Sequence, residues 1–127
     1  MEFTLDAEGM PTPRPRFNGK IAYMPKRYKD YQHKLVNLIK EKNLKKCDFC
    51  KIHITFHVMY PKSTPKYKKI DGLPLRLKFD VDNLAKGVMD ALEKAELVED
   101  DRQFYQLKVD KYRTTGTSKI QVKLWEC

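Results

Sequence analysis

Hydrophobic and polar residues follow two periods along this chain, and each period predicts a different kind of element. Alternation of apolar and polar residues predicts strands, whereas apolar residues at spacings of three and four predict amphipathic helices. In chain order, the predicted elements are strands at 2–6 and 20–23, a helix at 25–43, a strand at 52–60, a helix at 83–96, and strands at 104–112 and 119–125. This order predicts one α/β (α+β) domain over residues 1–127, with about two helices packed on a mixed or antiparallel sheet of four to five strands.

The segments between these elements carry turn signals. Residues 9–24 are rich in proline and basic residues and contain Asn18-Gly19, so they predict a loop with a turn. Residues 61–78 contain three prolines and a glycine, which predicts irregular backbone. Residues 114–117 (Thr-Thr-Gly-Thr) predict a hairpin between the last two strands.

The first helix has a clear start and a clear apolar face. Pro25 suits the first position of a helix, because its missing N–H is not needed there. Tyr28 and Tyr31 fall on the apolar face. We therefore expect both tyrosines to pack in the core; a platform for stacking bases is the alternative.

The composition is that of a globular chain with a strong positive charge. Its 127 residues include 26 Lys and Arg against 17 Asp and Glu, which gives a net charge of +9. Such a balance predicts an acidic partner, most commonly nucleic acid, although a generally basic protein would look the same. No apolar run approaches the roughly 20 residues that span a bilayer, and no secretory signal is present. We therefore expect a cytoplasmic protein without a membrane partner.

Basic residues concentrate in two of the predicted loops. Residues 61–78 contain six basic residues, opposed by Asp71 alone. A solvated surface loop is the ordinary interpretation, and an arm that contacts phosphates is the functional one. On charge, the residues expected to contact DNA are Arg14, Arg16, Lys66, Lys68, Lys69, Arg76 and Lys78.

An acidic island interrupts this basic chain. Residues 80–101 contain eight acidic residues and two lysines, a local charge of −6, so the remainder carries +15. Crowded carboxylates repel one another unless a cation or another partner lies among them. A basic protein around an acidic island suggests a polyanion held against a metal site, which is the arrangement that a metal-dependent nuclease needs.

Asp80 and Asp82 are the strongest candidates for metal ligands. In extended backbone, residues two apart point the same way, so both carboxylates can share one cation. Mg²⁺ prefers oxygen ligands and usually takes one or two protein carboxylates. Asp82 also has an ordinary explanation, since Asp just before a helix is a favoured N-cap worth about 1 kcal/mol.

Lys86 and Asp101 complete the candidate site. Lys86 lies opposite the apolar stripe near the helix start, where the dipole disfavours a cation, so a phosphate or the carboxylates would be its partner. A surface pair with Asp90 is the alternative, and Asp90, Glu93 and Glu96 are expected on a solvated face. From residue 83 to about residue 94 the helix rises roughly 18 Å, and the seven residues 95–101 can span up to about 23 Å. The chain is thus long enough to return Asp101 to Asp80 and Asp82.

A zinc site has to be considered because Cys47 and Cys50 form a C-x-x-C pair, with His53 and His57 following. The strand predicted over 52–60 would place both histidines on its polar face, about 13 Å apart at ~3.3 Å per residue. Zinc–nitrogen bonds of about 2 Å cannot bridge that separation. We therefore expect no zinc site, and we expect the cysteines to be reduced thiols.

These residues resemble a known family. The run Asp80-Val81-Asp82-Asn83-Leu84-x-Lys86, then Asp90-Ala91-Leu92 and Asp100-Asp101, is similar to the RusA family of Holliday junction resolvases. The family pattern is D-x-D-N-L-x-K-x-x-x-D-A-L, about eight residues, then D-D, and it is reproduced here without a gap. Residues 13–17 (Pro-Arg-Pro-Arg-Phe) and 23–25 (Tyr-Met-Pro) also look like phage and prophage members.

The resemblance implies a function and a set of site residues. Asp80, Asp82 and Asp101 would bind a catalytic Mg²⁺, for which Mn²⁺ would substitute, and Lys86 would be the essential lysine. The protein would be a homodimer that cleaves four-way junctions in DNA recombination and repair by paired, symmetric cuts. A non-catalytic nucleic-acid-binding domain, or a degenerate relative that only binds junctions, is the alternative.

Overall fold

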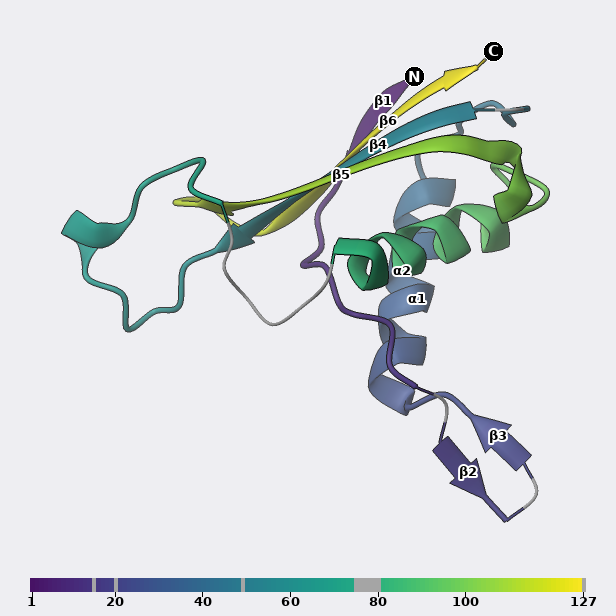
Figure 1. Cartoon of the computed structure of the whole chain (residues 1–127), viewed down its shortest axis with the longest axis horizontal. Coiled ribbons are helices and arrows are strands. Elements are labelled where there is room, and N and C mark those ends of the chain that lie inside the picture. Colours follow the sequence, from purple (N-terminus) through teal and green to yellow (C-terminus); the bar gives the residue numbers. More distant parts are fainter. Residues whose placement is uncertain (15, 20, 49, 75–80, 127) are drawn as a thin grey trace.

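Four strands form a mixed sheet, and two helices cover one of its faces (Figure 1). This computed structural model describes residues 1–14, 16–19, 21–48, 50–74 and 81–126, with backbone alone for residues 16 and 18. A two-stranded hairpin and a long connection project from this body in different directions (Figure 1). Within the described segments, no helix combines the length and the apolarity needed to cross a bilayer.

The sheet has the order β1-β6-β4-β5. β4 (Cys50–Met59) is central, parallel to β5 (Phe104–Thr114) and antiparallel to β6 (Lys119–Glu126). β1 (Glu2–Leu5) pairs antiparallel with the other edge of β6. The mixed four-stranded sheet and its two helices confirm the α+β fold class expected from the sequence.

The predicted hairpin at residues 114–117 is wrong. β5 and β6 do not pair with each other, because β4 lies between them and hydrogen-bonds to both. The connection crosses the end of β4, where the Met59 N–H donates to Ser118 Oγ at 2.9 Å. The core-facing side chains of β4 are almost completely buried, which favours a central position. Turn residues signal a reversal of the chain but not which strand enters between its two arms.

β4 has two chemically different faces, as its alternation predicts. Ile52 and Phe56 are each 1% exposed and pack toward the helices, while His53 and His57 are half-buried on the other face. Cys50 lies on the core side, where burial raises the pKa of its thiol to about 12. The cysteine and His53 therefore lie on opposite faces of the sheet.

α1 (Lys26–Lys40) begins immediately after Pro25. Tyr28 and Tyr31 are buried, which confirms that they belong to the core. The helix ends three residues earlier than the periodicity predicts, and Asn43 in the following turn adopts a φ of 50°. Asparagine is one of the few residues that tolerate this left-handed conformation.

α2 (Val81–Lys94) packs beside α1, and a buried glutamine joins the two helices. Gln32 on α1 is 3% exposed, and its Nε2 donates to the Gly87 carbonyl oxygen at 2.8 Å. Its Oε1 accepts a hydrogen bond from Lys94 Nζ at 3.4 Å. The apolar stripe of α2 is buried as predicted and consists of Leu84, Ala85, Gly87, Val88, Ala91 and Leu92.

The N-terminal loop contains more regular structure than its composition predicts. β2 (Arg16–Asn18) and β3 (Ile21–Tyr23) pair as an antiparallel hairpin. The strand predicted near 20–23 is confirmed at Ile21–Tyr23, but residues 16–18 were expected to be loop. Gly19 occupies the turn with a φ of 66°, a conformation that glycine adopts without a steric penalty.

The basic connection after β4 is irregular, as predicted, apart from a short 3₁₀ helix, η1 (Lys66–Lys68). Its end is fixed to the body. The Asp71 carboxylate accepts hydrogen bonds from the Thr115 N–H and hydroxyl, at 2.5 and 2.9 Å, and these bonds lower the pKa of Asp71. The Tyr60 hydroxyl donates to the Ile70 carbonyl oxygen at 2.7 Å, which closes the connection on itself.

Candidate active site on helix α2

Asp82 lies in the first turn of α2. The helix begins at Val81, so Asp82 is its second residue, whereas the N-cap interpretation places it just before the helix. Its Oδ1 accepts a hydrogen bond from the Asn83 N–H at 3.0 Å, and its side chain is exposed. The dipole at the start of the helix stabilises a carboxylate here. Asp82 therefore presents its carboxylate oxygens at the surface, at the start of the helix.

Lys86 and Asp90 continue the same helical face, one and two turns after Asp82, because residues four apart are neighbours on a helix. Lys86 is exposed, as predicted. Asp90 is half-buried, where a solvated position was expected. Burial raises the pKa of Asp90, and the positive charges of Lys86 and Lys94 oppose that rise. α2 thus presents a carboxylate, an ammonium group and a second, partly desolvated carboxylate in line.

The chain turns back toward the sheet after α2, at Glu96, which has a φ of 63°. It then forms the 3₁₀ helix η2 (Asp101–Gln103), with Asp100 as N-cap. Asp100 Oδ1 accepts from the Arg102 N–H at 2.9 Å, while Gln103 Oε1 accepts from the Asp100 N–H at 3.2 Å. Hydrogen bonds from Arg102 hold the pKa of Asp100 well below its usual range. Asp100 therefore has a structural role as the N-cap of η2, and this role distinguishes it from its neighbour Asp101.

Asp101 is the first residue of η2, which lies beside α2. η2 packs against α2, and the negative charge of Asp101 contributes to the raised pKa of Asp90. Asp82 lies eight residues before Asp90, which is about 12 Å along the helix axis. Asp80 lies outside the described residues. Among those that are described, no three His, Cys, Asp or Glu side chains are placed to hold a metal ion, so the ligand set stays a prediction.

Replacing Asp90 with asparagine is expected to raise the free energy of unfolding at neutral pH in metal-free buffer. Burial penalises the ionised form of Asp90, and asparagine carries no charge. A raised carboxyl pKa means that the folded state binds the proton more tightly than the unfolded state, so ionisation above about pH 4 destabilises the fold. Urea denaturation should show an advantage for Asp90→Asn near pH 7 that disappears near pH 3. A variant less stable than the parent at both pH values would contradict this account.

Among the described residues, those predicted to contact DNA fall on or beside the two projections. Arg14 precedes β2 and is exposed. On the connection after β4, Lys66 and Lys68 are exposed and Lys69 is half-buried. The side chain of Arg16 is not among those described, and Arg76 and Lys78 lie outside the described residues. Both predicted loops therefore present basic side chains to solvent.

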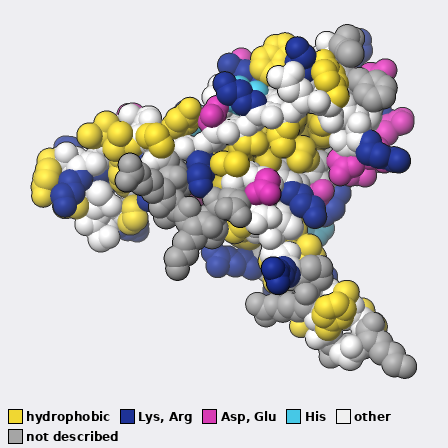
Figure 2. Space-filling model, in the orientation of Figure 1, with side chains coloured by type: hydrophobic (Ala, Val, Ile, Leu, Met, Phe, Trp, Pro, Cys, Tyr) yellow, Lys and Arg dark blue, Asp and Glu magenta, His cyan; other side chains and the backbone are white. Residues whose placement is uncertain are grey.

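The two projections lie on either side of the start of α2 (Figure 1). The β2–β3 hairpin extends from the start of α1, and the segment at residues 60–74 extends from the end of the sheet that lies away from the two chain termini. Acidic and basic side chains adjoin one another over α2, in the region between the projections (Figure 2). A polyanion that contacts both projections would pass across the acidic residues of α2.

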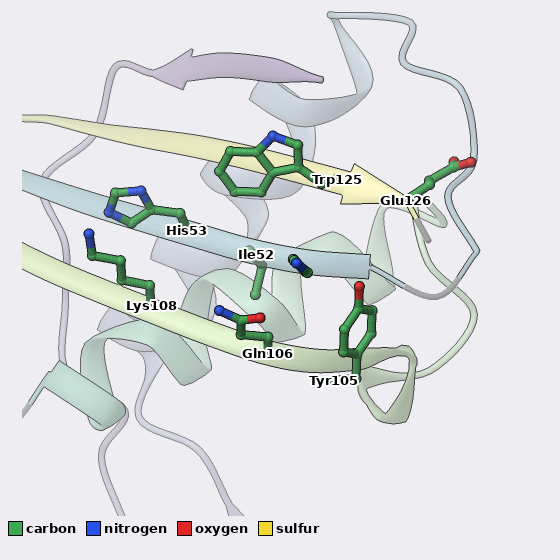
Figure 3. Close-up of a pocket in the computed structure, with 8 residues that line it drawn as sticks. Ile52, His53, Tyr105, Gln106, Lys108, Trp125 and Glu126 are labelled. Atoms are coloured by element: carbon green, nitrogen blue, oxygen red, sulfur yellow. The ribbon is translucent and has the colours of Figure 1, made fainter.

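A pocket of about 580 Å³ lies elsewhere, on the sheet face that the helices leave uncovered. Trp125 on β6 and Tyr105 on β5 flank it from either side of β4 (Figure 3). The remaining lining residues are Lys51, Ile52, His53, Gln106, Lys108 and Glu126. The sequence did not predict this pocket, because it exists only when β4 separates β5 from β6; apolar aromatic residues at polar-face positions were the available signal. It is separate from the α2 site.

These features define a small basic α+β domain whose second helix carries carboxylates and a lysine between two basic projections, a class of site suited to phosphate chemistry on nucleic acids. The comparison with protein families agrees. Residues 6–124 match the family described as endodeoxyribonuclease RusA, and the chain belongs to that family. No curated protein matches the sequence significantly. The match covers nearly the whole chain, so the family's endodeoxyribonuclease class applies to this domain as a whole.

Proposed function

We propose that this protein is a metal-dependent endonuclease that resolves Holliday junctions by paired, symmetric phosphodiester cleavage in DNA recombination and repair. Membership of the RusA family supports the endonuclease class. The observation that carries the proposal is the line of Asp82, Lys86 and Asp90 along α2, with Asp101 returned beside it, between two basic projections.

The chemistry of the proposed ligands suits a hard divalent cation. The proposed ligands, Asp80, Asp82 and Asp101, are all carboxylates, and Mg²⁺ and Mn²⁺ prefer oxygen donors. When bound, such a cation supplies a nucleophilic water and stabilises the leaving oxygen. Asp82 is exposed on the helix surface, so it can reach a ligand without rearrangement of the core.

Lys86 has a separate role in the proposed reaction. Its ammonium group is exposed one helical turn from Asp82, on the same face of α2. There it can hold an oxygen of the scissile phosphate and offset the negative charge that develops on that oxygen. A fixed positive charge at this point stabilises the transition state more than the ground state, because the phosphate gains charge during attack.

The basic projections would hold the arms of the junction through phosphate contacts. Such contacts fix the position of the DNA, carry little sequence information and weaken with salt. We also propose that the active form is a homodimer. A two-fold axis would relate two α2 sites to two equivalent strands of a four-way junction, which accounts for paired cuts.

The proposal is tested with an end-labelled four-way junction and a linear duplex of the same sequence. With Mg²⁺, the protein should introduce symmetric nicks in opposing strands of the junction and leave the duplex uncut. EDTA should abolish cleavage, and excess Mg²⁺ should restore it. Light scattering of the purified protein at the assay concentration tests the dimer.

The rival function is a junction-binding domain without catalysis. It predicts binding of the four-way junction but no product with Mg²⁺ or Mn²⁺ at any pH. That outcome, with protein that is folded and binds the junction, would overturn the nuclease proposal.

A further inference from the structure

The β2–β3 hairpin exposes large apolar side chains on both of its faces. Phe17 is 74% exposed, Ile21 is 70% exposed and Tyr23 is 42% exposed. Phe17 pairs across the strands with Ala22, and Ile21 and Tyr23 lie on the other face. The small Ala22 side chain leaves the phenylalanine ring uncovered. Both faces of the hairpin therefore carry large apolar side chains that are exposed to solvent.

The charge around the hairpin favours an anionic occupant. Residues 9–29 contain six basic residues and no acidic residue: Arg14, Arg16, Lys20, Lys26, Arg27 and Lys29. A second copy of the chain carries a net charge of +9, so its surface is on average a less favourable partner for this basic segment than a polyanion is. A two-stranded hairpin alone is marginally stable in water, so a partner that covers its apolar groups also stabilises it.

Phosphate contacts explain the basic residues but not the exposed ring of Phe17. Aromatic rings bind nucleic acids by stacking on base faces, and apolar side chains insert where a base stack is interrupted. Within linear duplex DNA every base face is covered by its neighbours. At the branch point of a four-way junction the strands exchange, so the continuous stack is interrupted there.

The segment just before the hairpin is hydrogen-bonded to the start of α2, next to the acidic site. In this segment, the Thr12 N–H and Oγ1 both donate to the Asn83 carbonyl oxygen, at 3.3 and 3.1 Å. Asn83 follows Asp82 directly in the first turn of α2. Thr12 Oγ1 also lies 3.3 Å from the Tyr28 hydroxyl on α1. A contact at the hairpin therefore fixes the DNA relative to the carboxylates of α2.

We propose that the β2–β3 hairpin recognises the branch point of junction DNA by placing Phe17 against unstacked bases, and so sets the distance from the branch to the cut. This inference rests on the proposed function for the identity of the DNA. It assigns junction selectivity to Phe17 and leaves general affinity to the basic residues.

The test uses a four-way junction with 2-aminopurine at the branch and a linear duplex with the same label, both in EDTA. Binding of the parent protein should raise the fluorescence of the junction and leave that of the duplex unchanged. Phe17→Ala should lose this rise and bind the junction about tenfold more weakly, with little change for the duplex. Phe17→Tyr should retain the rise. Tyr67→Ala, which removes an aromatic side chain that is 81% exposed on the other projection, is the matched control and should also retain it.

Four outcomes would overturn the inference. In the first three, the Phe17→Ala variant shows an undiminished fluorescence rise, loses affinity equally for the junction and the duplex, or no longer forms a dimer. The fourth outcome is that the parent protein does not bind the junction. The third outcome would make the hairpin a contact between protomers. Cleavage is measured separately, with Mg²⁺. If the fluorescence rise depends on Phe17 but no cleavage occurs, the inference is supported and the nuclease proposal is rejected. If the junction is cleaved but the fluorescence rise does not depend on Phe17, the nuclease proposal is supported and the inference is rejected.

Discussion

Asp82→Asn and Asp101→Asn are each expected to lower the rate of junction cleavage by at least about 10³-fold, the largest effect proposed for this protein. Asparagine keeps the size of the side chain but removes the charge that holds a divalent cation. Junction binding in EDTA should be unchanged or tighter, since a negative charge near the phosphates is lost. Single-turnover cleavage with saturating protein measures the chemical step, and fluorescence anisotropy measures binding.

Asp30→Asn is the matched control for the two site variants. Asp30 is an exposed aspartate on α1, and its replacement removes the same charge from the other helix. Asp82 stands in the first turn of α2, so Asp82→Asn also loses a dipole interaction worth about 0.3–1 kcal/mol, which thermal denaturation would detect. If the folded Asp82→Asn protein cleaves as fast as Asp30→Asn, Asp82 is not a ligand of the reaction's metal.

Lys86→Met is expected to slow cleavage by about 10²–10³-fold without abolishing metal dependence. Methionine keeps an unbranched chain at an exposed helical position, so the fold should be unaffected. The loss arises in the transition state, because the ammonium group would offset charge that develops on the phosphate during attack. The rate at saturating junction should therefore fall far more than the affinity for the junction.

Lys34→Met is the control here, since Lys34 is an exposed lysine on α1. Lys86→Arg should recover part of the rate, because the guanidinium keeps the charge but differs in shape and hydration. One result would reject the role of Lys86 in catalysis. If Lys86→Met weakened junction binding as much as it slowed cleavage, and higher protein concentration restored the rate, Lys86 would be a phosphate contact only.

Local patterns in the sequence were sufficient for most elements of the fold. The alternation at residues 52–60 predicted the two faces of β4, and the stripe at 84–95 predicted the buried face of α2. Both predictions hold because side-chain direction follows directly from backbone periodicity. The element ends were less accurate: α1 ends three residues early and α2 begins two residues early, since end residues gain little from packing.

The order of strands could not be read in this way. A turn signal at residues 114–117 favoured pairing of β5 with β6, yet β4 separates them. Strand pairing depends on which apolar faces meet in the core, and those contacts join residues far apart in the chain. The same reason explains the pocket beside Trp125, which requires three strands in that order.

For the candidate site too, some features could be predicted from the sequence and others depend on the fold. The acidic island, the D-x-D pair and Lys86 are visible in the sequence, because they are close together in the chain and contrast in charge with the rest of it. Chain length allowed Asp101 to return, but only the folded chain shows that η2, which begins at Asp101, packs beside α2. The half-burial of Asp90 was also missed, because burial depends on which distant segments pack beside the helix and not on the helical face alone.

The sequence by itself determined which residues carry charge, which faces are apolar and which chemistry the acidic island favours. These are properties of side chains and of local periodicity. Only the tertiary structure decided that β4 is central, that Asp100 caps η2 and that η2 packs beside α2. It also decided that Thr12, just before an exposed hairpin, hydrogen-bonds to the start of α2. Each of these features depends on contacts between segments that are far apart in the sequence, and such contacts form only when the whole core assembles.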